Sequence, residues 1–393
     1  MTKQRIPRLG CTLWFLAFST AAGAAEFAGL DWSGSGFATV AIGKMLNGVP
    51  TQMQSGYACP CFVSDFAQGG VYQQGGLQWQ PDSKVGWQGK ASLNPDFSVT
   101  GQVVMRAAAG GHVDFEWLYG NWRLNEQFSL QIGRKRLPLL YYSESQDVGF
   151  AYPWVHLSPQ IYGWEIVNFN GANLAYQGQW GDWSSSVDLF TGSETVRNSN
   201  YWQMYNGRYT RTDSRWRNLL GADVSLSKDA LEIRLAMMQS ELANTNPKAA
   251  NPLAFGPATP QYIYSASLHY EAAHWLIHGG LLYINRKASY GEDFSRSFAV
   301  GYRIGNYLPM LSHNRYYQKQ HYAPALGLSP AQAEAHHNTA LSLRYELTPA
   351  SALKLQYDHW QNDAQPAFFI ANPNSAVPMG SSSLLSMSYD LLF

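Results

Sequence analysis

Charged residues recur at alternate positions inside otherwise apolar segments of this chain. Glu232 and Arg234 alternate with leucine and isoleucine between positions 231 and 235. In an extended strand this spacing places the charges on one face and the apolar side chains on the other. A wall of such charges suits the selection of small solutes and ions. By this criterion the candidate basic pore-lining residues are Arg106, Lys135, Arg217, Arg234, Arg303, Arg344 and Lys354. Their acidic counterparts are Glu232, Glu271, Glu346, Asp358 and Asp390.

The segment 137–163 carries a second group of candidates. Glu144 and Asp147 are its acidic residues, and Tyr152 and Trp154 are weaker aromatic candidates. A connection of this length is long for a simple turn, which favours a functional loop. We expect it to fold inward as a constriction; the alternative is an external lid or a subunit contact. Arg134 and Arg136 are further weak candidates. Their parity with Leu130 and Ile132 points them outward, so either a bulge re-aims them near the rim or they lie at the lipid interface or a subunit contact.

Motifs for catalysis or metal binding are lacking in the sequence. It contains no Gly-x-Ser-x-Gly and no His-Glu-x-x-His, and the adjacent His336 and His337 would point to opposite faces of a strand. Two cysteines, Cys59 and Cys61, cannot complete a structural zinc site. We interpret them as a local disulfide or an unimportant pair, with metal or redox chemistry as the alternative. We therefore expect no enzyme activity, no metal and no cofactor.

The N-terminus has the pattern of a secretory signal peptide, which we assign to residues 1–24. Three basic residues precede the apolar run 11–18, and the small residues 22–24 follow it. The alternative, an uncleaved anchor, is disfavoured because the apolar run is too short to span a bilayer. Removal of the three basic residues leaves 24 basic and 27 acidic residues, a net charge of −3.

The composition excludes several classes of protein. Of the 393 residues, 46% are hydrophobic, 14% aromatic and 14% charged, and the mean hydropathy is −0.27. Beyond the N-terminus no apolar run reaches the length of a membrane-spanning helix. The aromatic content argues against disorder, and 27 basic against 27 acidic residues give no footprint for nucleic acid.

Period-two alternation continues through the chain after residue 30, and short turns alternate with long loops. This pattern is typical of a transmembrane antiparallel β-barrel with short periplasmic turns and long extracellular loops. We expect about sixteen strands in a single domain, residues 25–393, with outward aromatic residues at the lipid interfaces. The expected spans are 34–45, 71–92, 97–107, 113–124, 128–136, 165–180, 184–195, 215–227, 231–242, 261–272, 275–287, 294–305, 307–319, 336–348, 352–363 and 383–393.

The last strand ends in Tyr389 and the terminal Phe393, and so resembles the insertion signal of Gram-negative outer-membrane proteins. The stretches 82–86, 133–138, 142–144 and 147–154 look like a group of proteobacterial porins related to the phosphate-selective porins. This resemblance implies a trimeric passive channel whose third long loop folds into the lumen. It does not imply phosphate selectivity, because the balanced charge lacks a dense ladder of arginine and lysine.

Together these observations predict an outer-membrane channel for passive diffusion of small hydrophilic solutes or ions, narrowed by loop 137–163. The alternatives are a substrate-specific channel for organic acids, sugars or anions, and a non-conducting structural or adhesin barrel. The expected partners are outer-membrane lipid, two further copies of the chain, the barrel-insertion machinery acting on the C-terminal strand, and small solutes. Nucleic acid is not an expected partner.

Overall fold

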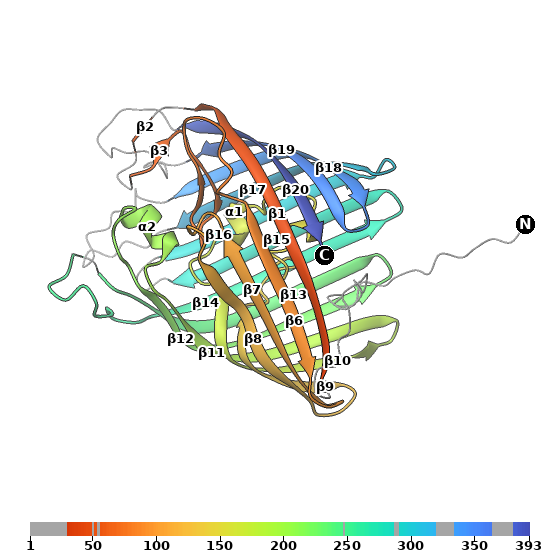
Figure 1. Cartoon of the computed structure of the whole chain (residues 1–393). Coiled ribbons are helices and arrows are strands. Elements are labelled where there is room, and N and C mark those ends of the chain that lie inside the picture. Colours follow the sequence, from red (N-terminus) through yellow and green to blue (C-terminus); the bar gives the residue numbers. More distant parts are fainter. Residues whose placement is uncertain are drawn as a thin grey trace, which may run out of the picture.

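The computed structural model describes residues 30–48, 51–52, 56–246, 248–286, 291–319, 334–363 and 380–393; the predicted signal peptide lies outside them. Sixteen antiparallel strands form a closed barrel (Figure 1), which confirms the predicted fold. The barrel strands are β1 (Asp31–Gly48), β6 (Lys84–Ser92), β7 (Phe97–Arg106), β8 (Val113–Arg123), β9 (Phe128–Arg136), β10 (Asn168–Trp180), β11 (Trp183–Val196), β12 (Ser214–Lys228), β13 (Leu231–Asn244), β14 (Thr259–Ala272), β15 (Trp275–Arg286), β16 (Gly291–Tyr302), β17 (Tyr307–Lys319), β18 (Ala335–Thr348), β19 (Ser351–Asn362) and β20 (Ser381–Leu392).

The barrel closes where β1 pairs with both β20 and β6. Alternation in β20 shows why a sheet of this sequence closes. Met387 and Tyr389 are 47% and 38% exposed on the outer face, whereas Ser388 and Asp390 are buried on the inner face. An apolar exterior and a polar interior suit lipid outside and water inside, and closure leaves no strand edge unpaired.

The predicted strand 71–92 is wrong in its first half. The barrel strand begins only at Lys84, and the preceding segment forms two small hairpins, β2 (Thr51–Gln52) with β3 (Ala58–Cys59) and β4 (Phe62–Asp65) with β5 (Gly70–Tyr72). The apolar residues of the second hairpin pack on the inner wall of the barrel instead of facing lipid. Cys59 and Cys61 form the local disulfide that the sequence suggested.

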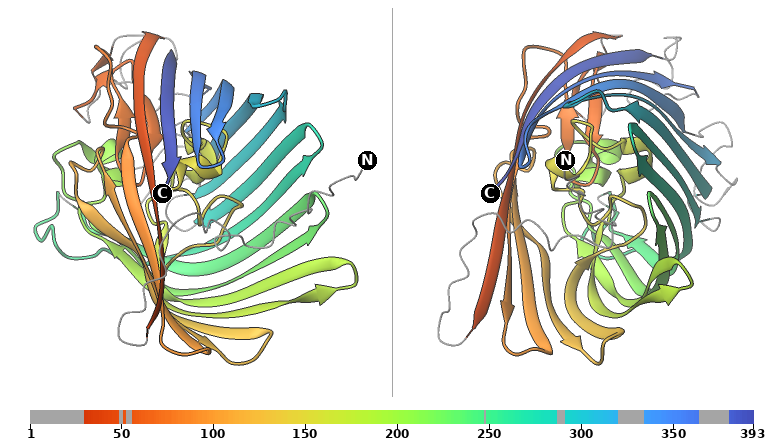
Figure 2. Two further views of the ribbon diagram at one scale, coloured as in Figure 1. Left: turned by 45° about the vertical axis from the view of Figure 1, so that its right-hand side comes forward. Right: turned by 90° about the vertical axis from the view of Figure 1, so that its right-hand side faces the viewer.

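Between β9 and β10 the chain runs through the barrel interior as the loop 137–167 (Figure 2), which we name the inner loop. It contains a short 3-10 helix, η1 (Gly149–Ala151), and one turn of helix, α1 (Pro159–Tyr162). A further short helix, α2 (Asn200–Asn206), follows β11. Among the described residues, none of the helices has the length and apolar character needed to cross a membrane.

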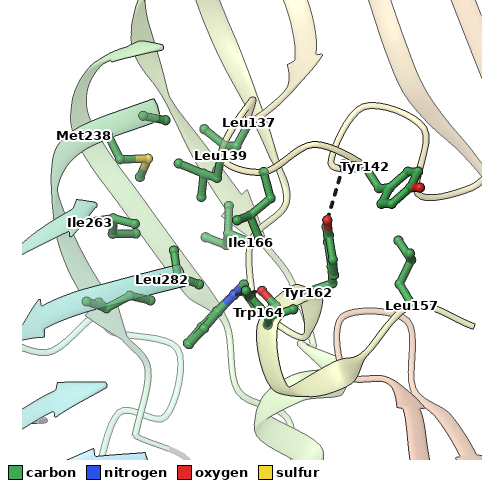
Figure 3. Packing of buried hydrophobic residues seen from close by; sticks show 14 of the residues in the cluster. Leu137, Leu139, Tyr142, Leu157, Tyr162, Trp164, Ile166, Met238, Ile263 and Leu282 are labelled. Atoms are coloured by element: carbon green, nitrogen blue, oxygen red, sulfur yellow. Dashed lines mark hydrogen bonds between the residues drawn. The ribbon is translucent and has the colours of Figure 1, made fainter. Parts of the chain in front are cut away.

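A hydrophobic cluster fixes the inner loop to one side of the wall (Figure 3). The loop contributes Leu137, Leu139, Tyr142, Leu157, Tyr162, Trp164 and Ile166. The wall contributes inward side chains of β10 to β17, among them Met238, Ile263 and Leu282. Burial of large apolar side chains is worth about 1.5–3 kcal/mol each, so this packing holds the loop firmly.

Candidate functional site

The tip of the inner loop is tied to the wall by Asp147, which contacts two arginines. Arg106 on β7 donates to the Asp147 carboxylate from Nε at 3.1 Å and from Nη2 at 2.7 Å. Arg136, at the end of β9, donates to the other carboxylate oxygen, so it points inward and not outward as its parity indicated. Glu116 on β8 accepts from Arg106 at 2.6 Å and lies 3.1 Å from Arg136. Two cations and two anions thus neutralise one another in a buried cluster, which we name the tip cluster.

Glu116 belongs to this cluster because β8 contains a bulge. The register jumps between Gln102, which faces Trp117, and Val103, which faces Phe115. The extra residue lets both Glu116 and Trp117 turn inward, which simple alternation forbids. Sequence reasoning missed Glu116 for this reason; a carboxylate between two aromatic residues was the available signal.

The two arginines of the tip cluster keep the Asp147 carboxyl ionised. Burial alone would raise the pKa of the Asp147 carboxyl, but Arg106 and Arg136 outweigh burial and hold that pKa well below its ordinary value. The Asp147 carboxylate therefore stays ionised across the pH range in which bacteria grow.

A second tether lies on the wall beyond the seam of β1 and β20, where Lys354 of β19 holds the loop backbone. Its Nζ donates to the carbonyl oxygens of Gly149 at 2.6 Å and Trp154 at 2.8 Å. The same Nζ lies 2.9 Å from a carboxylate oxygen of Asp390 on β20, whose other oxygen accepts from Thr39 on β1 at 2.6 Å. A Cβ atom on Gly149 would come within 2.2 Å of the Asp390 carboxylate, so only glycine allows the loop this close.

Between the two tethers, His156 bridges two carboxylates. Its Nδ1 lies 3.0 Å from Asp82, just before β6, and its Nε2 lies 3.2 Å from Asp358 on β19. Burial alone would lower the pKa of His156, but the two carboxylates outweigh burial and raise that pKa to about 10. The sequence pointed to Asp358 as an acidic candidate, but nothing in the spacing showed that it meets His156 and Asp82.

The remaining basic residue on this wall, Arg344 of β18, also holds the loop backbone. Its Nη1 donates to the carbonyl oxygens of Phe150 at 2.7 Å and Tyr152 at 3.2 Å. The weaker aromatic candidates Tyr152 and Trp154 are themselves buried in the loop. These three candidates therefore fix the loop.

Lys135 and Arg234 face the interior on the other side of the loop. Arg234 of β13 donates to Glu144 at 3.0 Å and to the Leu140 carbonyl at 3.2 Å. Lys135 of β9 donates to Gln131. For Glu144, burial alone would raise the pKa, but Arg234 and Lys135 lower it below its ordinary value. Glu144 is half-buried and reaches the open part of the interior.

Arg217 lies on the outer face of the barrel. A bulge between Arg217 and Leu220 breaks the alternation of β12, so that Trp216 and Leu219 are the inward residues. Arg217 is exposed and donates from Nε to Glu241 at 2.6 Å. The prediction that it faces the lumen is wrong because one extra residue reverses the parity of everything beyond it.

Two further candidates, Arg303 and Arg134, lie away from the lumen. Arg303 lies in the turn after β16 and donates to Glu271 and Glu346, each at 3.0 Å. Arg134 points outward, as its parity predicted, and pairs with Glu194. Arg303 is thus a residue of the short-turn rim, and Arg134 a residue of the outer wall.

The described residues enclose a large open space in the interior, a cavity of about 840 Å³. Inward residues of β6 to β9 form one wall and the inner loop forms the other. At one end the cavity is lined by residues of the short turns, including Asn125 and Glu126, and by the terminal Phe393. We name this space the lumen cavity; it reaches the end of the barrel at which the short turns lie.

No family model and no curated protein sequence matches the chain. Solved structures of outer-membrane proteins match it over nearly its whole length. A loop-deletion mutant of OmpT of Vibrio cholerae has a TM-score of 0.57 at 7% identity and covers 93% of this chain and 99% of its own. A trimer form of OmpT has a TM-score of 0.53 at 9% identity, covering 93% and 99%. The anion-selective porin of Comamonas acidovorans has a TM-score of 0.52 at 13% identity, covering 93% and 100%.

These likenesses establish the fold: the chain is a sixteen-stranded barrel of the outer-membrane type, shared with porins. Identities of 7–13% carry no selectivity or activity from those proteins to this one.

Proposed function

We propose that this protein is a passive channel of the Gram-negative outer membrane for small hydrophilic solutes or ions, narrowed by its inner loop. The observation that carries the proposal is the lumen cavity of about 840 Å³ between the loop and the polar wall of a closed barrel. A loop that only plugged the barrel would not need to leave a polar space beside it.

We further propose weak ion selectivity. The strongly basic groups around the loop are paired: Arg106 and Arg136 with Asp147, and Arg234 with Glu144. A paired charge exerts little net field on a passing ion, so neither anions nor cations are strongly preferred. Passage by diffusion needs no cofactor, and we propose no catalytic activity.

We also propose how the protein is exported and assembled. Residues 1–24 are removed as a signal peptide, and Tyr389 and Phe393 serve the barrel-insertion machinery. Three copies associate in the membrane. The trimer form of the Vibrio OmpT supports association only through the shared fold.

The test is single-channel conductance of the purified protein in planar lipid bilayers, with reversal potentials in a KCl gradient. We expect stepwise ion currents, a reversal potential near zero and closure in three steps. Absence of any conductance would overturn the channel and leave a structural or adhesin barrel. A reversal potential at the anion limit would overturn weak selectivity.

A further inference from the structure

A row of amide side chains lines the inner face of five neighbouring strands, β6 to β10, and is interrupted between β7 and β8, where Gln102 faces Trp117. Its members are Gln88, Gln102, Asn121, Gln131 and Asn173. Gln102 Nε2 donates to Gln88 at 3.0 Å, Gln131 Nε2 to Asn121 at 3.1 Å, and Asn173 Nδ2 to Gln131 at 3.0 Å. Each amide offers two donors and an acceptor with two lone pairs. Gln131 also accepts from Lys135 and Asn173 also donates to Asp188, so the spare capacity lies mainly on Gln88, Gln102 and Asn121, which line the lumen cavity. The row therefore presents neutral hydrogen-bonding groups to the interior.

Aromatic rings stand beside this row in the same space. Trp117 and Tyr119 of β8 line the lumen cavity on the wall side, and Tyr141 and Tyr142 line it on the loop side. Aromatic faces bind apolar C–H surfaces, while phenolic hydroxyls add hydrogen bonds. Solutes that carry both hydroxyl groups and C–H faces match this combination.

The charged side chains that line the lumen cavity are balanced in number. Three basic and three acidic residues line it: Lys90, Arg123, Arg234, Glu126, Glu144 and Glu232. Arg234 is paired with Glu144, and Arg123 is paired with Asp96 at the rim. Because neither sign is in excess, an ionic solute that loses water here gains little from the net field of the cavity, whereas a neutral polar solute exchanges its water for amides.

We propose that the lumen cavity is a binding subsite for uncharged, hydroxyl-rich solutes, the class that includes mono- and disaccharides. The cavity volume lies within the range of about 300–1,000 Å³ that is typical of small-molecule sites. This inference rests on the proposed channel function and specifies which solutes the channel retains. The amide row supplies the hydrogen bonds and the rings supply the faces.

The first test compares solutes on the unmodified protein in planar bilayers. Glucose and maltose are added to a conducting channel, with gluconate as the charged probe of matched size. We expect the saccharides to reduce the KCl current in a saturable manner, and gluconate to do so only weakly. A linear decrease that follows solution viscosity for all probes would overturn the subsite. Absence of any KCl current would instead overturn the channel itself.

The second test removes the amides in pairs. Gln88→Leu with Gln102→Leu deletes both partners of one hydrogen bond at similar volume, so no unpaired group remains. We expect the saccharide dissociation constant to rise about fivefold, which corresponds to loss of a single net hydrogen bond. Gln239→Leu makes the same chemical change on the exposed outer face of β13 and is the matched control. Equal saccharide affinity in the double variant and the control would overturn the proposal. If the double variant does not insert, the solute comparison on the unmodified protein decides.

Discussion

Two halves of the barrel wall treat their inward positions differently. The strands β10 to β17 direct apolar side chains such as Leu219 and Met238 into the interior, where the inner loop covers them. The strands β6 to β9 direct amides and hydroxyls inward, where the lumen cavity leaves them open. Both halves have an apolar outer face. The sequence of one half therefore describes a sheet between lipid and protein, and that of the other a sheet between lipid and water.

Strict alternation of apolar and polar residues fails in the covered half. In the covered half, adjacent apolar residues occur as pairs, such as Met237 with Met238 and Leu281 with Leu282. In each pair the first residue is more than half exposed on the outer face, and the second is buried inside. Such pairs mark the strands against which a loop packs.

The largest effect is expected at the buried tether between the inner loop and β19, where the loop also covers the wall. Lys354→Met leaves the Asp390 carboxylate without its cation and frees the Gly149 carbonyl, so we expect a loss of about 3–5 kcal/mol in the free energy of unfolding. Denaturant unfolding of protein folded in liposomes measures it. Lys90→Met in the lumen cavity is the matched control, with an expected change below about 1 kcal/mol. Equal losses in both variants would contradict the distinction between wall that the inner loop covers and wall that it leaves open.

An intermediate effect is expected at the tip cluster. Asp147→Asn keeps the shape but removes one anion from the pair of arginines, so we expect a destabilisation of about 1–3 kcal/mol. The freed positive charge should also raise the conductance and shift the reversal potential toward anions. Asp96→Asn at the exposed rim is the control. An unchanged reversal potential would show that the tip cluster does not face the permeation path.

A smaller effect is expected from pH through His156. Its folded pKa of about 10 lies above the ordinary value, so its stabilisation is complete below about pH 6.5 and is lost as pH rises through 10. We expect current noise to increase over this range as the bridge from Asp82 to Asp358 weakens. In His156→Gln the noise should not depend on pH in this range. The same pH dependence in both proteins would assign it to another group.

The smallest effect is expected at the rim of the open half. Arg123 and Asp96 form an exposed pair at 3.1 Å, and exposed pairs contribute about 0–1 kcal/mol. Arg123→Ala should therefore change both the free energy of unfolding and the conductance within experimental error. A conductance change as large as that of Asp147→Asn would move the narrowest point from the loop tip to the rim.

The sequence predicted the fold well because alternation is a local property. Fifteen of the sixteen strand spans agree with the structure within a few residues, and only the strand before Lys84 was extended too far. The site was harder to predict. Arg106, Lys354 and Asp147 were named as pore residues, but their partners depend on register and on two bulges. A bulge is a single inserted residue with no period of its own, which is why Glu116 was missed and Arg217 was placed on the wrong face.

The seam between the first and last strands has a consequence for assembly. Gly36 and Phe393 exchange two backbone hydrogen bonds, and Thr39 contacts Asp390 across the same seam. These partners are separated by more than 350 residues, so a nascent chain lacks them until its final segment has left the ribosome. Until then β1 offers an unpaired edge to any other strand nearby. A carrier that shields this edge during transit would therefore be needed by the full-length chain, and truncation before β20 should leave an aggregating intermediate.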